Sequence, residues 1–390
     1  MKFTSLKFVF RVSIIISSVI LLLVAFYINL SAVLSSFNML MDFGSFIASG
    51  QFARAGTNPY SNNSPLIFNV YFPKLNHFGS APNLNPPISV IVFEQIINFP
   101  PLSSVIVWRI ASVFLYVIPL IFLLRKQNQT HPKMTWRLIW LLNLAGFWHT
   151  IELGQIYIPL FLIALGVVIH GKKENFLVSG VLLGVLIAIK PNFVFWAVAL
   201  GVAGYWQVLL SAGGIAILIS LIPLCIYGIT IYTQWFEATK IFTPNLLIFP
   251  GNNSFQGLSA HFGSSSTGTI IGVFTALTIL VFIAKYKPEI DKINLIAIIT
   301  SLLISPIAWT GYTLFVIPCM IIVEKWEWQQ WIAAAIFTVP FFVILAFFQD
   351  SFFNFIFFGW FYGWGLLLLL VSEISKIIIR ASQDKQTENA

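Results

Sequence analysis

Long apolar segments alternate with short polar ones along most of the chain. A helix that spans a membrane needs about 20 apolar residues, and fewer where the protein shields its ends, so this pattern predicts about twelve transmembrane helices. The predicted helices cover residues 12–35, 102–124, 137–150, 155–170, 176–190, 192–205, 207–228, 269–285, 292–307, 310–323, 330–348 and 355–376. The first segment exceeds the apolar region of a cleavable signal peptide, about 7–15 residues, so we interpret it as an uncleaved helix.

The basic residues indicate how these helices cross the membrane, because Lys and Arg stay preferentially in cytoplasmic loops. With a cytoplasmic N-terminus, sixteen of the 21 basic residues fall on the cytoplasmic side and the other five fall outside. Counting residues 86–98 as a further span would reverse this distribution, so we interpret that segment as a short helix at the outer face. Both termini are therefore expected in the cytoplasm, with residues 381–390 as a disordered tail.

Two outer loops, residues 37–101 and 230–268, are too long for simple turns. They are rich in Asn, Gly, Pro, Ser and aromatic residues, and long loops of this kind are usually functional or disordered. We expect them to be ordered, with helices that lie in the membrane interface. The pattern thus predicts one all-α polytopic membrane domain over residues 1–380, with its chemistry at the outer face.

The composition supports a membrane protein and excludes other classes. The chain is 58% hydrophobic and only 9% charged, whereas soluble domains average about 25% charged residues. A soluble enzyme, a nucleic-acid-binding domain and a disordered scaffold are therefore excluded. The net charge of +8 needs no nucleic acid, since cytoplasmic basic residues explain it. Cys225 and Cys319 lie in apolar runs without metal-ligand spacing.

Few acidic residues are left for chemistry at the outer face. They are Asp42, Glu94, Glu152, Glu237 and Asp350. Asp42 follows the first helix directly, at the mouth of any cavity on that side, where a carboxylate can act as a general base. The alternative is a helix-end carboxylate or an ion pair with Arg54.

Glu152 lies between two predicted spans, with Gln155 beside it, and the two can orient a sugar hydroxyl. The alternative for Glu152, which its position by itself favours, is an ordinary loop charge. Lys190 stands before Pro191, which breaks the helix. Its functional interpretation is a phosphate contact, and the alternative is a lysine that extends to the membrane interface.

Amides and aromatic rings gather in the later outer segments. Residues 252–254 (NNS) carry amides that can bind carbohydrate hydroxyls, and they also form a glycosylation sequon. Residues 305–312 (SPIAWTGY) suit either a sugar-stacking wall or an aromatic interfacial belt. A nucleotide-sugar DxD motif is absent from the sequence, which argues against a metal-bound nucleotide donor. We expect neither a metal nor another cofactor.

In their order along the chain, several short motifs resemble the polyprenol-phosphate-sugar-dependent glycosyltransferases of the integral-membrane GT-C class. In particular they resemble glycosyltransferase family eighty-seven, which includes the polyprenol-phosphate-mannose-dependent α-1,2-mannosyltransferases. The motifs are Asp42-Phe43, GTNPY at 56–60, NLNPP at 83–87, GQ at 154–155, AIKP at 188–191, NNS at 252–254 and SPIAW at 305–309.

The resemblance implies a GT-C fold and an inverting transfer at the outer face of the membrane. A hexose, most simply mannose, would move from a polyprenyl phosphate to a hydroxyl of a lipid-linked or glycan acceptor. Asp42 matches the catalytic carboxylate of the family. The other partners would be membrane lipids, and the process would be synthesis of cell-envelope glycans, in the plasma membrane if the source is a prokaryote.

The resemblance also implies the substrate contacts. Family members often have arginine where His261 stands and histidine where Gly311 stands. The contacts to the leaving phosphate are therefore assigned jointly to Arg54, Lys190 and His261. The residues assigned to the sugar and the acceptor are Tyr60, Asn85, Glu152, Gln155, Asn253, Trp309 and Tyr312.

Two other functions are compatible with the composition. A lipid or solute transporter would have charged residues in mid-helix and internal repeats. Here the predicted helix centres are nearly free of charge, and no repeat is evident. A non-catalytic assembly protein is the third possibility.

Overall fold

The computed structural model describes residues 2–72, 76–126, 131–323, 326–348 and 351–388. Asp350 lies outside these ranges. The described chain is almost entirely helical, with a single two-stranded sheet. The prediction of an all-α membrane protein is therefore confirmed at the level of class.

Five described helices are long and apolar enough to cross a membrane. They are α1 (Lys2–Ser35), α4 (Pro101–Lys126), α10 (Trp206–Tyr227), α13 (Ser265–Tyr286) and α19 (Phe361–Glu388). Large apolar side chains on these helices face outward: Leu21 is 69% exposed, Phe122 71% and Phe274 72%. Such exposure is expected where lipid, rather than water, surrounds a helix.

A sixth span forms if two helices joined by a 76° bend are counted together. These are α16 (Trp328–Thr338) and α17 (Phe341–Phe347), and the bend falls at Pro340, which cannot donate a backbone hydrogen bond. The remaining apolar segments form shorter helices, so the number twelve stays a prediction. The shorter elements are α5 (His131–Leu142), α6 (Ala145–Leu153), α7 (Tyr157–Lys172), α8 (Phe176–Ile189), η2 (Pro191–Phe193), α9 (Val194–Val202), α14 (Ile290–Ile304), η3 (Thr310–Val316), α15 (Ile317–Ile322) and α18 (Phe352–Phe357).

Close packing between the apolar helices depends on small residues. A Cβ atom at Gly180 of α8 would lie 2.7 Å from the carbonyl oxygen of Val208, and one at Gly184 would lie 2.6 Å from that of Ala212. Both acceptors belong to α10, so the two helices approach closely along this glycine edge. Small residues four apart are a common basis of helix packing in membranes.

The elements of the two outer loops are short and mostly helical. They are α2 (Met41–Arg54), β1 (Phe68–Phe72), β2 (His77–Ala81), α3 (Ile88–Glu94), α11 (Thr230–Leu247) and α12 (Phe255–Ala260). Helix α3 lies within residues 86–98, where the charge distribution predicted a short helix. The antiparallel hairpin of β1 and β2 was not predicted.

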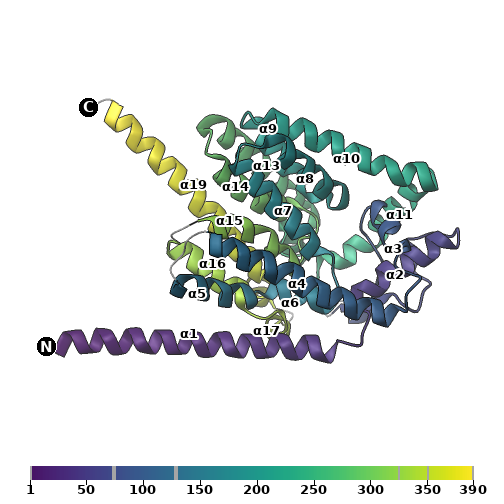
Figure 1. The fold of residues 1–390 in the computed structure, drawn as a ribbon, viewed down its shortest axis with the longest axis horizontal. Helices are drawn as coiled ribbons and strands as arrows, with labels where there is room; N and C mark the ends of the chain where they lie inside the picture. Colours follow the sequence, from purple (N-terminus) through teal and green to yellow (C-terminus); the bar gives the residue numbers. More distant parts are fainter. Residues whose placement is uncertain (1, 73–75, 127–130, 324–325, 349–350, 389–390) are drawn as a thin grey trace.

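The two chain ends lie at one end of the molecule, and α2, α3 and α11 lie at the other (Figure 1). The arrangement agrees with two termini on the same side and with both long loops on the opposite side. Helix α19 continues through residues 381–388, where the sequence led us to expect a tail without regular structure.

Candidate active site

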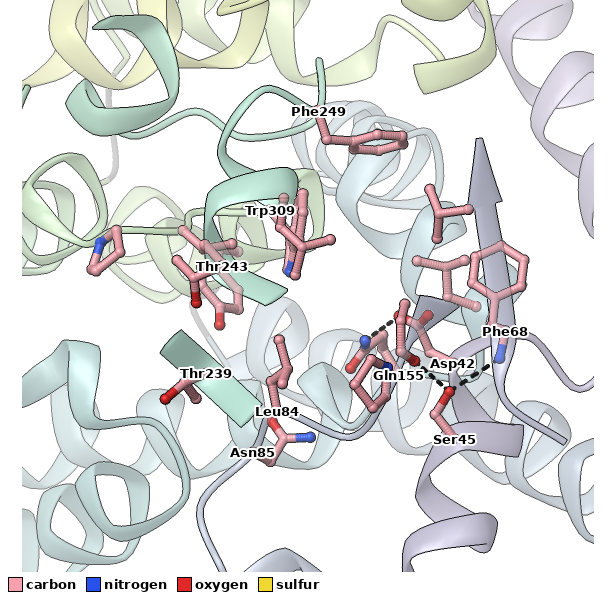
Figure 2. A pocket seen from close by; sticks show the side chains of 18 of the residues that line it. Asp42, Ser45, Phe68, Leu84, Asn85, Gln155, Thr239, Thr243, Phe249 and Trp309 are labelled. Atoms are coloured by element: carbon pink, nitrogen blue, oxygen red, sulfur yellow. Dashed lines mark hydrogen bonds between the residues drawn. The ribbon is translucent and has the colours of Figure 1, made fainter. Parts of the chain in front are cut away.

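The outer-loop elements enclose a cavity with a volume of about 1490 Å³. Its walls come from α2, β1, the junctions of α6 with α7 and of α8 with η2, helices α11 and α17, and residues 306–312. Figure 2 shows some of the side chains that line the cavity, with Asp42 and Gln155 facing each other. A cavity with a largely apolar lining and a few convergent polar groups is the usual form of a ligand site.

Asp42 lies in the first turn of α2, and its carboxylate accepts a hydrogen bond from Nε2 of Gln155. The preceding Gly154 makes this pairing possible, because its φ of +67° ends α6 in a left-handed turn. A Cβ atom at Gly154 would lie only 2.8 Å from Cβ of Phe43. The sequence Gly154-Gln155 therefore serves both the turn and the close approach to α2.

A buried arginine joins the two segments that carry this pair. Arg109 of α4 is 1% exposed, and its guanidinium donates five hydrogen bonds, as many as it has N–H groups. The acceptors, at 2.5–3.1 Å, are the backbone carbonyl oxygens of Ser36, Phe37, Met39, Ile151 and Glu152. Three of them precede Asp42 and two precede Gln155, so one side chain holds together the two backbone segments that carry Asp42 and Gln155.

Burial makes two carboxyl groups of the cavity weaker acids than usual. Desolvation raises the pKa of Asp42 to about 6, against the opposing effects of the Gln155 hydrogen bond and the charge of Lys190. Desolvation also raises the pKa of Glu152 to about 7, with Arg109 acting in the opposite direction and Asp42 in the same one. A base with a pKa near the working pH is suited to proton transfer.

Lys190 reaches the cavity because the chain is extended at this residue. Its φ of −135° and ψ of 87° separate α8 from η2, and the following proline disfavours a helical conformation here. The side chain is 8% exposed. Its ammonium donates to Oδ1 of Asn85 at 2.6 Å and lies 4.9 and 5.4 Å from the ring centres of Tyr157 and Tyr312.

The NLNPP motif explains how Asn85 is oriented. Oδ1 of Asn83 accepts from the side-chain amide of Asn85 at 2.9 Å, and the Asn83 amide donates to Oγ of Ser49 and of Ser89. Both Asn side chains are buried. The amide chain fixes which Asn85 atom faces the lysine, so an acceptor oxygen is presented to the ammonium.

The NNS and SPIAW motifs bind each other. Oδ1 of Asn252 accepts from the backbone N–H of Ala308 at 2.9 Å, and the hydroxyl of Ser254 donates to the Pro306 carbonyl at 2.9 Å. An isolated β-bridge pairs Asn252 with Trp309. The contacts place the Trp309 ring on the cavity wall, 5.7 Å from the ring centre of Phe249.

Seven of the residues assigned from the sequence line the cavity together. They are Asp42, Asn85, Glu152, Gln155, Lys190, Trp309 and Tyr312. The other four do not line it. The Tyr60 hydroxyl donates to the Asn85 carbonyl at 3.1 Å, and the Asn253 amide donates to the carbonyls of Gly251 and Ala308.

The two other residues that were assigned to the leaving phosphate, Arg54 and His261, do not line the cavity. Arg54 donates to Oδ1 of Asn98 at 2.5 Å and to the carbonyl of Glu94 at 2.7 Å, and it lies 3.9 Å from the Glu94 carboxylate. It therefore pairs with Glu94, not with Asp42. His261 is 2% exposed and its ring stacks on Phe355 with centres 5.1 Å apart.

Sequence reasoning missed Arg109 and Tyr157. Arg109 was visible as the one basic residue inside the predicted helix 102–124, and a buried charge in such a segment is a functional signal in itself. Tyr157 offered no such signal, since it stands among apolar residues. In the described ranges, no group of three or more His, Cys, Asp or Glu side chains is arranged to hold a metal ion.

The fold and this cavity define a polytopic helical membrane protein with a carboxylate and a lysine in one buried site. The family described as glycosyltransferase family 87 matches residues 83–306, more than half of the 390 residues. The chain therefore belongs to glycosyltransferase family 87 and is a glycosyltransferase. No curated protein and no solved structure matches it.

The matched region contains Asn85, Glu152, Gln155 and Lys190 but begins after Asp42. Family membership favours an enzyme over a transporter. Because Asp42 lies outside the matched residues, the family match does not bear on it. The evidence for its part in the site is its position in the cavity and its hydrogen bond to Gln155, a residue within the matched region.

Proposed function

We propose that this chain is an inverting glycosyltransferase that moves a hexose, most simply mannose, from a polyprenyl-phosphate donor to an acceptor hydroxyl. The acceptor would be a lipid-linked sugar or a glycan. The observation that carries the proposal is the presence in one cavity of a carboxylate held by Gln155 and an ammonium held by Asn85. A base for the nucleophile and a cation for the leaving group are the two charges that such a transfer needs.

In the proposed reaction, Asp42 takes the proton of the acceptor hydroxyl while that oxygen forms a bond to the anomeric carbon. The bond from this carbon to the phosphate oxygen breaks, and its electron pair stays on the lipid phosphate. Lys190 stabilises the charge that develops there. Attack opposite the leaving group inverts the anomeric configuration, and Glu152 and Gln155 are positioned to hold sugar hydroxyls.

The apolar part of the cavity supports a lipid-linked donor. Aromatic and aliphatic side chains from α11, α17 and the connections after them cover the wall away from Asp42, namely Phe236, Leu246, Phe249, Phe341, Phe342, Leu345 and Phe348. A hexose and a phosphate are too small and too polar to cover so much apolar surface, whereas a polyprenyl chain gains free energy from every apolar group that it buries.

A donor panel tests the proposal. Purified protein is given cell-envelope extract as the acceptor and, in turn, short-chain polyprenyl phosphates of mannose, glucose and galactose, and GDP-mannose. Mass spectrometry follows the products. We expect transfer from one of the lipid donors, also in EDTA, and none from GDP-mannose. Transfer from GDP-mannose alone, or from none of the four, would reject the lipid donor.

We further propose that the cavity opens at the outer face and that both termini are cytoplasmic. Sixteen of the 21 basic residues then lie on the cytoplasmic side, and the two chain ends lie at the end of the molecule opposite to α2 and α11 (Figure 1). In a Cys225→Ser, Cys319→Ser background, Asn62→Cys should react with an impermeant thiol reagent added to intact cells. Lys172→Cys should stay unlabelled until the cells are opened, and the opposite pattern would invert the orientation.

A further inference from the structure

The β1–β2 hairpin is attached to the helix that carries Asp42. The hydroxyl of Ser45, one turn after Asp42, donates to the Ala81 carbonyl at 2.6 Å and accepts from the Phe68 N–H at 3.2 Å. Phe68 and Ala81 are paired residues at the open end of the hairpin. One serine thus holds both strands at a fixed distance from the carboxylate, as the dashed lines in Figure 2 show.

Strand β1 borders the cavity. Phe68, Asn69, Val70 and Tyr71 line it, whereas Ala81 is the one residue of β2 that does. Among the described residues the sheet has two strands, so the other edge of β1 has no strand partner there, and an edge of this kind can offer peptide groups to hydroxyl groups. The proposed donor phosphate contact, Lys190, comes from a different wall, the break between α8 and η2.

The two faces of the hairpin differ because side chains alternate along a strand. On one face, the side chain of Phe72 is buried, with 1% of its surface exposed, and packs over Gly79. On the other face, Tyr71 is paired with Phe78 in the register, their ring centres are 5.1 Å apart, and they are 42% and 72% exposed.

Polar groups flank these two rings and are themselves held in place. The Tyr71 hydroxyl donates to Oδ1 of Asn76 at 2.7 Å, and the Asn62 amide donates to Oγ of Ser80 at 2.9 Å. Ser80 is paired with Asn69, which reaches the cavity. Exposed rings bordered by amides and hydroxyls match a sugar, which offers both C–H faces and hydroxyls, better than they match a lipid chain.

We propose that this outward face, formed by Asn69, Tyr71, Phe78 and Ser80, binds the sugar units of the acceptor next to the attacking hydroxyl. The acceptor is then an oligosaccharide or a glycolipid with at least two sugars, and its far end lies along the hairpin outside the cavity. The inference rests on the proposed transfer reaction and adds to it the class of acceptor.

The test compares two hairpin variants, Tyr71→Ala and Phe78→Ala, with the control variant Phe99→Ala. Phe99 lies in the connection between α3 and α4, is 63% exposed and does not line the cavity. Transfer is measured at graded amounts of envelope extract with the lipid donor that the panel identifies, and the masses of the products count the sugars of each acceptor. Hydrolysis of the donor in the absence of acceptor reports on the donor site.

We expect acceptors with at least two sugars to predominate, and each hairpin variant to raise their apparent KM about threefold to tenfold, the range for contacts between rings. Phe99→Ala and the rate of donor hydrolysis should stay unchanged. Hairpin variants that behave like Phe99→Ala would overturn the acceptor face. Equal loss of transfer and donor hydrolysis would instead indicate a role in membrane contact or folding, and would also overturn it. Absence of transfer by the unaltered protein would reject the underlying reaction.

Discussion

Asp42→Asn is expected to lower sugar transfer by about 10²–10⁴-fold, the usual contribution of a general base. Asn has the size of Asp and can keep a hydrogen bond with Gln155, but it cannot accept a proton from the acceptor hydroxyl. The donor KM and the yield of folded protein should therefore stay near those of the unaltered chain. Initial rates with the identified lipid donor measure the effect.

Two further variants test whether the loss of transfer is specific to the carboxylate of Asp42 and to its position. Glu237→Gln neutralises another outer acid, which is exposed on α11 and outside the cavity lining, and it should leave transfer unchanged. Asp42→Glu moves the carboxylate by one methylene, a misplacement that costs on the order of 10²-fold in an active site. If Asp42→Asn turned over at near the normal rate, Asp42 would not be the base, and Glu152 would be the next candidate because it lines the same cavity.

The pH dependence gives a separate check on Asp42. The base must be ionised to act, and burial raises the pKa of Asp42 to about 6. The transfer rate should therefore rise as the pH increases through about 6, whereas with an exposed aspartate, whose pKa is about 3.9, the rise would come about two pH units lower. The residual activity of Asp42→Asn should lack this rise. A rate that is constant from about pH 4.5 to 7 would contradict the proposed environment of the carboxylate.

The positions of the helices could be predicted because their apolar segments contrast with short polar breaks. Each predicted segment contains a helix or a pair of helices in the structure. Their lengths were less predictable: residues 137–150 split into α5 and α6, and residues 330–348 bend at Pro340. Where other helices shield the chain ends, a span needs fewer apolar residues, so hydropathy alone does not set the count.

The site was predictable where a residue type was rare on the side of the membrane that we predict to be the outer one. Asp42 and Lys190 stood out because few charges occur there, and the structure brings both to one cavity. Arg54 and His261 satisfied the same criterion, yet Arg54 pairs with Glu94 and His261 stacks on Phe355. Partners distant in sequence decide such cases, and a single sequence does not reveal them.

The hairpin and the hydrogen-bond partners of Arg109 could not be predicted, for different reasons. The strands are only five residues long and lie in a loop rich in turn-forming residues, where alternation is too brief to identify. Arg109 binds carbonyl oxygens rather than acidic side chains. Carbonyl groups occur at every residue, so no sequence pattern points to them.

Lys190→Gln is expected to lower transfer by about tenfold to more than a hundredfold, because a hydrogen bond to a charged group contributes about 1.5–3 kcal/mol. Gln can donate hydrogen bonds but brings no positive charge to the leaving phosphate. Most of the loss should appear in kcat, since charge on the phosphate increases as its bond to the sugar breaks. Lys190→Arg keeps the charge and should recover part of the activity.

Arg54→Gln and His261→Gln are the matched controls, because both residues were assigned to the phosphate from the sequence and neither lines the cavity. Arg54→Gln should retain donor kinetics within about twofold, the scale of surface substitutions. His261→Gln replaces a buried ring, so its kinetics are compared per amount of folded protein, where kcat and donor KM should also stay near normal. Steady-state rates at graded donor concentrations separate kcat from KM for all four variants. If Lys190→Gln kept normal kcat while Arg54→Gln or His261→Gln lost it, the leaving phosphate would lie on another wall, and the reaction geometry built on Lys190 would be wrong.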